Sequence, residues 1–196
     1  MTDIITLQTD RLLLRQWTPQ DRAHFAQLNA DPEVMKYYPE TLSRDASNEM
    51  ADKIESLISS QGWGFWALEL KQDASFIGFT GLHKPQYELP VTPCVEVGWR
   101  LAREHWGKGY ATEAGRAALD TAFNTLQLAE VYSFATVTNS PSIAVMQRLH
   151  MQDTHRNFEH PVMPSTSPLR EHCLYKISHE QWLKQHNKSN KSNNNN

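Results

Sequence analysis

The stretch HWGKGYATEA, residues 105–114, places two glycines and a lysine directly before an alanine-rich helix. It follows an alternating apolar segment, VEVGWRLA at residues 95–102, which is typical of a strand. Glycine lets the backbone turn sharply and approach a ligand closely, and the first N–H groups of a helix have no partner within the helix. The pattern therefore predicts either an ordinary strand-to-helix connection or a site where a helix start binds an anion.

The helix that begins here, expected over residues 109–126, has a narrow face. Its small residues recur three or four positions apart, so that they share one side. They are Ala111, Ala114, Ala118 and Ala122. A face of this kind predicts close packing against a sheet.

Hydrophobic periodicity and turn residues predict the strands and helices of the rest of the chain. Strands are expected at residues 11–16, 63–70, 75–82, 95–102, 131–137, 152–158 and 172–177, and helices at 18–30, 43–61, 109–126 and from 139 onward. Thr18-Pro19 and Asn139-Ser140-Pro141 both combine a capping residue with a first-turn proline. The polar turn KQDA predicts an antiparallel hairpin between the second and third strands.

Length and composition indicate one globular domain. The chain has 196 residues, of which 39% are hydrophobic and 21% charged, which is enough for a single core. We expect one domain over residues 1–186 and a disordered tail rich in Asn, Ser and Lys over residues 187–196.

Charge and apolar patterning argue against several partners. The net charge is -3, and no run of Lys or Arg is long enough for a nucleic-acid surface. The N-terminus lacks the pattern of a signal peptide, and no segment approaches the ~20 apolar residues of a membrane span. The two cysteines, Cys94 and Cys173, lack zinc-ligand spacing. We expect a cytoplasmic protein with free thiols and no nucleic-acid partner, membrane partner or metal.

The glycine-lysine-glycine turn suggests three kinds of phosphate site. A Walker loop requires G-x-x-x-x-G-K-[ST], but Lys108 lies between the glycines and is followed by Gly109. A dinucleotide fingerprint requires G-x-G-x-x-G/A, but the sixth position is Thr112 and antiparallel-looking strands precede the loop. The pyrophosphate of coenzyme A remains as the third hypothesis.

Three segments resemble the GNAT superfamily of N-acetyltransferases, in particular its RimJ/RimL-like branch, which contains ribosomal-protein-alanine N-acetyltransferases. They are DRLLLRQWTPQD, VEVGWRLAREHWGKGYATEA and TNSPSIAVMQRLHM. The resemblance covers residues 11–177. It implies the mixed α/β, or α+β, acyl-CoA N-acyltransferase fold, with a mostly antiparallel, splayed sheet of about seven strands flanked by four helices.

The resemblance also implies an activity. The protein would be an acetyl-CoA-dependent enzyme that transfers the acetyl group directly to a primary amine in a ternary complex, without a metal. The acceptor would be a protein N-terminal α-amine or a small-molecule amine. The protein would work as a monomer or a homodimer.

Residue positions follow from the same resemblance. The family's loop pattern, Arg/Gln-x-x-Gly-x-Gly/Ala, aligns with Trp106, Gly109 and Ala111, so that Trp replaces the usual Arg or Gln. Main-chain N–H groups of the loop would bind the pyrophosphate, and backbone groups of the central strand would bind pantetheine and polarise the carbonyl. The predicted cofactor-binding residues are Trp99, Arg100, Leu101, Trp106, Gly107, Lys108, Gly109, Tyr110, Ala111, Thr112, Asn139 and Ser142.

Two residues are candidates for proton transfer. Glu96 is the carboxylate of the central strand and is the candidate base; an exposed, solvated Glu is the alternative. Deprotonating a lysine-type amine (pKa ~10.4) at pH 7 costs roughly 4.6 kcal/mol, and an α-amine near ~8 costs about 1.4. Many family members have a Tyr acid where this chain has Met146, and the branch implies Ser142 instead. A first-turn serine that satisfies backbone groups is the alternative.

Departures from the family pattern leave a second interpretation open. Trp106, Met146 and His150 all differ from the usual residues, and His150 is expected in the left-handed conformation where the family has Gly. The alternative is a catalytically silent module that senses acyl-CoA or binds a protein.

Other chemistry near the site has weaker support. Cys94 as a nucleophile would need a neighbouring base, so we interpret it as a structural thiol. His83 and Trp66 are expected to be packing residues. The resemblance implies that the acceptor is selected by the first two helices and their loop, including residues 31–40, together with the loop 85–93 and the segment 158–171.

Overall fold

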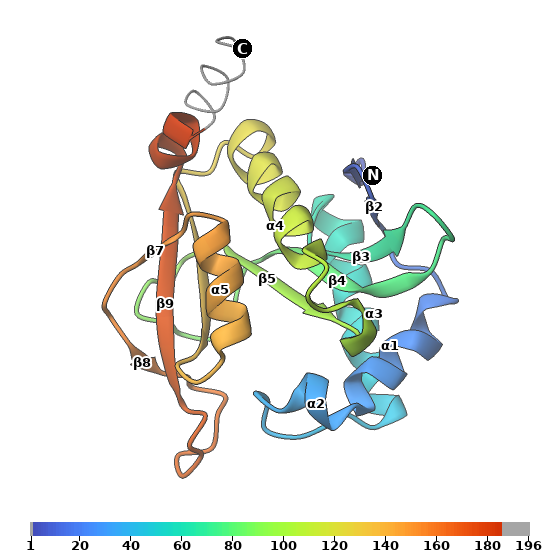
Figure 1. Ribbon diagram of the computed structural model, residues 1–196, viewed down its shortest axis with the longest axis horizontal. Helices are drawn as coiled ribbons and strands as arrows, with labels where there is room; N and C mark the ends of the chain where they lie inside the picture. Colours follow the sequence, from blue (N-terminus) through green and yellow to red (C-terminus); the bar gives the residue numbers. More distant parts are fainter. Residues whose placement is uncertain (1, 186–196) are drawn as a thin grey trace.

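A computed structural model describes residues 2–185 of the chain (Figure 1). The predicted tail at 187–196 lies outside the described residues. The strands are β1 (Leu7–Gln8), β2 (Leu12–Arg15), β3 (Phe65–Leu70), β4 (Phe76–His83), β5 (Glu96–Leu101), β6 (Glu130–Thr136), β7 (Gln152–Asp153), β8 (Phe158–Glu159) and β9 (Glu171–Ser178). The helices are α1 (Asp21–Ala30), α2 (Pro32–Met35), α3 (Arg44–Gln61), α4 (Tyr110–Asp120) and α5 (Ser140–Arg148), and residues 179–185 are also helical.

The strands form one sheet in the order β1-β2-β3-β4-β5-β6-β9-β7, with β8 also paired to β9. Neighbouring strands run antiparallel except β5 and β6, which are parallel and share a single registered residue pair. The mixed, mostly antiparallel and splayed sheet is therefore confirmed. It has nine strands in the described residues, two more than predicted.

The two additional strands are β1 and the second part of the predicted strand at 152–158. The strand β1 pairs with β2 and was not predicted. The predicted strand at 152–158 divides into β7 and β8, because His155 adopts φ 54° and its N–H donates to Asp153 Oδ1 at 2.8 Å. The turn interrupts pairing with β9 between the two short strands.

Capping residues place two helix starts as predicted. Ser43 Oγ accepts from Ala46 N (3.1 Å) at the start of α3. Asn139 Oδ1 accepts from Ser142 N (3.1 Å) at the start of α5. The side chains of Ser43 and Asn139 thus satisfy first-turn N–H groups, as these residue types commonly do.

Two predicted helix boundaries are wrong. The helix α1 begins at Asp21 rather than Thr18, because the Asp21 carboxylate accepts from Thr18 N (2.7 Å) and holds residues 18–20 in a turn. The α-helical part of the predicted 109–126 helix ends at Asp120, and a π-helical turn follows over Thr121–Thr125. The short helix α2 was not predicted. Asp31 follows the last residue of α1, and its side chain accepts a hydrogen bond from Glu33 N at the start of α2.

Helices cover both faces of the sheet (Figure 1). On one face, Phe25 of α1 packs edge-on against Phe79 of β4, with ring centroids 6.0 Å apart. We call this the α1/α3 face. The helix α4 lies on the opposite face against β4 and β5, where Ala114 and Ala118 are fully buried. Within residues 2–185, none of the helices has the length and apolar character that crossing a bilayer requires.

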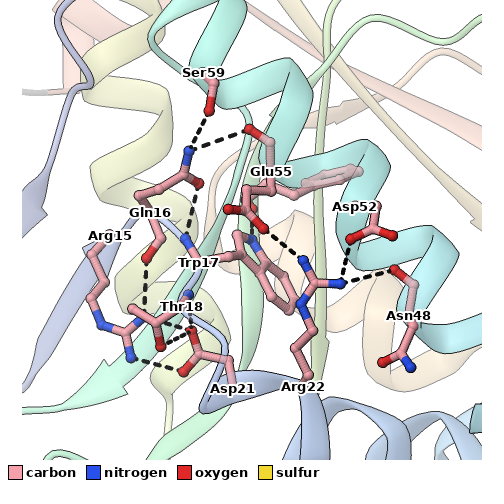
Figure 2. Close-up of polar contacts among 11 residues, drawn as sticks. Arg15, Gln16, Trp17, Thr18, Asp21, Arg22, Asn48, Asp52, Glu55 and Ser59 are labelled. Carbon is pink, nitrogen blue, oxygen red and sulfur yellow. Dashed lines mark hydrogen bonds and ion pairs between the residues drawn. The ribbon is translucent and has the colours of Figure 1, made fainter.

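A buried ion pair attaches α1 to β2 (Figure 2). Arg15 donates to both carboxylate oxygens of Asp21 at 2.8 and 2.9 Å, and its Nε donates to Glu69. Asp21 is only 2% exposed. Burial by itself would raise the pKa of Asp21, but the hydrogen bonds from Arg15 and Thr18 hold this pKa below its usual value. The ion pair therefore stabilises the fold while Asp21 is ionised.

We expect Asp21→Ala to lower the free energy of unfolding by roughly 3 kcal/mol at pH 7, because Arg15 would lose its most buried partner. Since the pKa of Asp21 is lowered by folding, its contribution is complete above the unfolded pKa of about 3.9 and disappears as the pH falls further. Urea unfolding at pH 7 and pH 3 measures both effects.

The matched control is Asp52→Ala. Asp52 forms an ion pair with Arg22, but its side chain is 66% exposed (Figure 2). An exposed pair contributes under about 1 kcal/mol. Equal losses of stability in the two variants would contradict the buried-pair account.

Candidate functional site

The connection between β5 and α4 has the geometry of an anion site. Gly107 and Gly109 have φ angles of 72° and 83°, which strongly favour glycine. Gly109 is the N-cap of α4, and no side chain of the described residues caps the first turn. The N–H groups that begin α4 belong to Tyr110, Ala111 and Thr112. This uncapped helix start can accept an anionic group.

Arg11 fixes this loop from the turn before β2. Its Nη1 donates to the carbonyl of Lys108 at 3.0 Å, and its guanidinium lies 4.5 Å from the ring centroid of Tyr110. Its Nη2 also pairs with Glu113 Oε2 at 2.6 Å. The carbonyl of Lys108 is thereby turned toward Arg11, and the charge of Glu113 is neutralised beside the helix start.

Sequence reasoning did not identify Arg11 as part of this site. The signal was present in the first family-like segment, DRLLLRQWTPQD, but that segment lies about 100 residues from the loop. Nothing in local spacing relates Arg11 to Glu113.

Trp106 packs at the end of β5. Its indole Nε1 donates to Leu101 O at 2.8 Å, and the residue is 40% exposed. The indole therefore holds the loop against the strand. The role expected for an Arg or Gln at this position, a side-chain contact with phosphate, has no equivalent in a Trp side chain, which is a neutral single donor.

The strands β5 and β6 are joined at one end and separate beyond it. Tyr132 N donates to Val95 O at 2.9 Å, and the one registered pair joins Glu96 to Tyr132. Backbone groups alternate along a strand between its two neighbours. The backbone N–H and C=O of Val95 point toward β6. Those of Val97, Trp99 and Leu101 point the same way and therefore face the gap.

The backbone of Arg100 faces the other way. Ala102 N donates to Ile77 O at 2.9 Å, which places Ala102 and Arg100 on the β4 side of β5. The backbones of Trp99 and Leu101 therefore face the gap, as their predicted contact with pantetheine requires, although Leu101 O already accepts from Trp106 Nε1. The proposed contact of Arg100 is not kept, because its N–H and C=O pair within the sheet.

Glu96 is buried at the closed end of the gap. The residue is 9% exposed and pairs with His83 on β4, so both side chains project from the α1/α3 face. Burial raises the pKa of Glu96 to about 8. The alternative of an exposed, solvated Glu is excluded. A buried carboxylate with this pKa is suited to exchange a proton with an amine.

A pocket of about 630 Å³ lies on the same face, between α3 and the strands β3 and β4. Phe65 forms part of its wall and stacks on His83 at 5.2 Å between ring centroids. Burial lowers the pKa of His83, which favours its neutral form. The expected packing role of His83 is therefore observed, but His83 also places the pocket beside Glu96. The opposite wall of the pocket is formed by Met50, Ile54 and Leu57 of α3.

A histidine-aromatic cluster covers the same face of β6 and β9. His160 and His172 have ring centroids 4.7 Å apart, and His160 Nε2 lies 3.2 Å from the hydroxyl of Tyr87. Burial, together with His172, lowers the pKa of His160 to about 4, so His160 is neutral at pH 7. The cluster connects the predicted acceptor segments 85–93 and 158–171.

The start of α5 presents two free polar groups. The amide nitrogen of Asn139 and the hydroxyl of Ser142 form no hydrogen bond with any residue that the structure describes, although Asn139 Oδ1 caps the helix. The alternative role for the Ser142 hydroxyl, satisfying first-turn backbone, is therefore not observed. Met146 is fully buried, and His150 adopts the predicted left-handed conformation with φ 57°.

Metal binding and thiol catalysis were also considered for the part of the chain that the structure describes. Among residues 2–185, no cluster of three or more His, Cys, Asp or Glu side chains is arranged to hold a metal ion. Burial, and then the nearby Glu96 and Glu130, raises the pKa of Cys94 to about 11. A thiol with this pKa stays protonated at pH 7 and is a poor nucleophile.

Comparison with known proteins gives one family. Residues 11–152 match the family described as "Acetyltransferase (GNAT) domain". The uncharacterized protein YkkB of Bacillus subtilis is 33% identical over 159 residues, which are 80% of this chain and 91% of that protein. The FsC-acetyl coenzyme A-N(2)-transacetylase of Aspergillus fumigatus is 30% identical over 188 residues, which are 91% of this chain and 78% of that protein.

Solved structures share the fold. A GNAT-family acetyltransferase from Bacillus anthracis superimposes with a TM-score of 0.75 at 23% identity, covering 90% of this chain and 99% of that one. The ribosomal-protein-S5-alanine acetyltransferase from Vibrio fischeri gives a TM-score of 0.71 at 14% identity, covering 91% and 98%. Both likenesses show the fold.

Proposed function

The chain belongs to the GNAT acetyltransferase family, and we propose from this premise that it transfers an acetyl group directly from acetyl-CoA to a primary amine in a ternary complex. The proposed acceptor is a protein N-terminal α-amine or a small-molecule amine. The observation that carries the proposal is the uncapped start of α4 beside the gap between β5 and β6. A buried carboxylate, Glu96, lies at the closed end of that gap.

We propose that acetyl-CoA lies along this gap. Its pyrophosphate would accept hydrogen bonds from the loop and helix start, residues 107–112, where a helix terminus favours anions. The pantetheine arm would pair with Trp99 and Leu101, like an added strand, and with the amide of Asn139. Within residues 2–185, the N–H of Trp99 has no sheet partner and the amide nitrogen of Asn139 donates to no residue, which supports the proposal. The carbonyl of Leu101 already accepts from Trp106 Nε1, so only the N–H of Leu101 is available to pantetheine.

The proposed reaction needs two proton transfers and no covalent enzyme intermediate. The amine nitrogen attacks the thioester carbon while the N–H of Trp99 stabilises the developing oxyanion. The C–N bond forms, the C–S bond breaks, Glu96 takes the proton of the amine, and the Ser142 hydroxyl protonates the CoA thiolate. Ser142 then regains a proton from water, and Glu96 releases its proton to solvent, so that both groups return to their starting states. An α-amine with pKa ~8 has nearly the proton affinity of Glu96, whose pKa is about 8, so this transfer is close to balanced.

Release of the CoA thiol tests the proposed function. The purified protein would be mixed with acetyl-CoA and a panel of amines: peptides, ribosomal-protein N-termini, polyamines, amino acids and aminoglycosides. We expect thermal stabilisation by acetyl-CoA and thiol release with at least one class. Stabilisation without release for every amine would contradict acetyl transfer and support the silent-module alternative.

Arg11 offers a test of loop positioning. We expect Arg11→Met to raise the dissociation constant of acetyl-CoA about five- to tenfold, because a loss of about 1 kcal/mol in loop preorganisation changes affinity by that factor. Calorimetry measures the effect. The control is Arg116→Met, which removes an equal charge from an exposed position of α4. A similar loss of affinity in both variants would show a general charge effect rather than positioning.

A further inference from the structure

Arg100 is a buried cation whose contacts with the described residues include no carboxylate. The residue is 8% exposed, and its Nη1 donates to the neutral amide oxygen of Asn29 at 2.7 Å. Its guanidinium lies 4.1 Å from the ring centroid of Tyr38 and 5.5 Å from that of Phe79. Its Nε is buried without a hydrogen-bond partner. Its Nη2 also donates to no described residue, so one edge of the guanidinium is unused.

This arrangement differs from that of Arg15, which is half-buried. Arg15 has two carboxylate partners, Asp21 and Glu69. Burying a charge without a counterion is costly, and aromatic rings offset part of that cost by cation–π attraction. The free Nε and Nη2 of Arg100 have the fork geometry that binds a carboxylate.

The location of Arg100 relates it to the acceptor rather than to acetyl-CoA. Side chains alternate along a strand, so Arg100 projects from the same α1/α3 face as Glu96, four residues or roughly 13 Å along β5. Trp99, whose N–H faces the reacting carbonyl in the proposed mechanism, adjoins Arg100 in the chain. An amine that approaches from this face thus encounters both side chains.

Two neighbours of Arg100 strengthen this placement. Tyr38 belongs to the segment 31–40, one of those expected to select the acceptor. Met50, whose Sδ lies 3.8 Å from Arg100 Nη1, also lines the 630 Å³ pocket. The pocket extends to His83, the strand neighbour of Glu96. Arg100 and Glu96 do not line the pocket themselves, but each adjoins it on the α1/α3 face, Arg100 through Met50 and Glu96 through His83.

We propose that Arg100 binds a carboxylate of the acetyl acceptor, so that the preferred substrate is an amine that also carries a carboxylate. The inference rests on the proposed function, because it concerns the acceptor of that reaction. A peptide with an acidic residue near its N-terminus and a small amino carboxylic acid both belong to this class. The carboxylate would complete the unused edge of the guanidinium.

Matched acceptors test the proposal. Each pair differs by one carboxylate: the C-terminally amidated peptides Ala-Glu-Ala-Ala and Ala-Gln-Ala-Ala, and 4-aminobutyrate with its amide. We expect the acidic member to have a kcat/KM about 10- to 100-fold higher, mainly through KM, since hydrogen bonds to charged groups contribute about 1.5–3 kcal/mol. Arg100→Gln should remove this preference, and Arg100→Lys should keep part of it.

A stability measurement separates recognition from a purely structural role. Arg100→Met replaces a buried cation that has no carboxylate partner by an apolar side chain, but it also removes the donor to the buried Asn29 Oδ1. Because these two effects oppose each other, we expect its Tm to stay close to that of the wild type. A lower Tm together with equal losses for both members of a pair would show a structural arginine and overturn the proposal. So would an acidic preference that survives in Arg100→Gln, or thiol release only with amines that lack a carboxylate. Absence of thiol release with every amine would instead contradict the proposed function itself.

Discussion

Gly109→Glu is expected to abolish measurable binding of acetyl-CoA, with a loss of affinity of more than about 100-fold. Gly109 has φ 83°, which a glutamate adopts only with strain, and a Cβ here would lie 3.5 Å from Arg11 Nη2. The new carboxylate would stand at the helix start, where the pyrophosphate is proposed to bind. Calorimetry and thermal shift with acetyl-CoA measure the result.

Gly109→Ala separates backbone strain from charge. Alanine introduces the same Cβ without the carboxylate, so we expect a loss of affinity under about tenfold, in line with roughly 1 kcal/mol of strain. If Gly109→Glu bound acetyl-CoA as tightly as the wild type does, the loop would not be the binding site.

Glu96→Gln is expected to lower kcat/KM by about 10²- to 10³-fold, the usual contribution of a positioned base. Because the pKa of Glu96 is raised to about 8, the wild-type rate should increase with pH through pH 8 and then level off. With an acceptor amine whose pKa lies well below 7, which does not titrate in this range, the variant should lack this rise, while its affinity for acetyl-CoA should remain unchanged. A variant with the wild-type rate and pH profile would show that Glu96 is not the base.

The same substitution is expected to stabilise the protein. The unfolded chain ionises Glu96 near pH 4.3, whereas the folded chain keeps its proton until about pH 8. The unfolded state therefore binds fewer protons between these values, and wild-type stability falls as the pH rises through this window. Glutamine does not titrate, so the gain in Tm for Glu96→Gln should increase from pH 5 to pH 8. A gain in Tm that is independent of pH would contradict the burial argument.

Local sequence signals predicted the elements that local interactions determine. Ser43 and Asn139 cap their helices through residues only three positions away. Gly107 and Gly109 adopt the backbone conformation that their residue type favours. The pattern of the central segment predicted a loop between a strand and a helix, and the structure has this loop between β5 and α4.

Features that depend on contacts between residues distant in the sequence could not be predicted from local sequence signals. The start of α1 depends on the Asp21 carboxylate turning back to Thr18 in the presence of Arg15. The loop contact of Arg11 joins residues about 100 positions apart. The N–H and C=O of Arg100 point toward β4 because of the strand register, which no sequence motif predicts. These are properties of strand register and packing rather than of spacing.

Transfer in a ternary complex is the central claim, and labelled acetyl-CoA tests it most directly. The protein mixed with acetyl-labelled acetyl-CoA alone is expected to acquire no covalent label, in agreement with the raised pKa of Cys94, and to release no CoA thiol. Addition of an accepted amine should then yield acetylated amine and CoA thiol in equal amounts. Label on the protein before any amine is added, or no acetylated amine afterwards, would contradict direct transfer at the gap between β5 and β6.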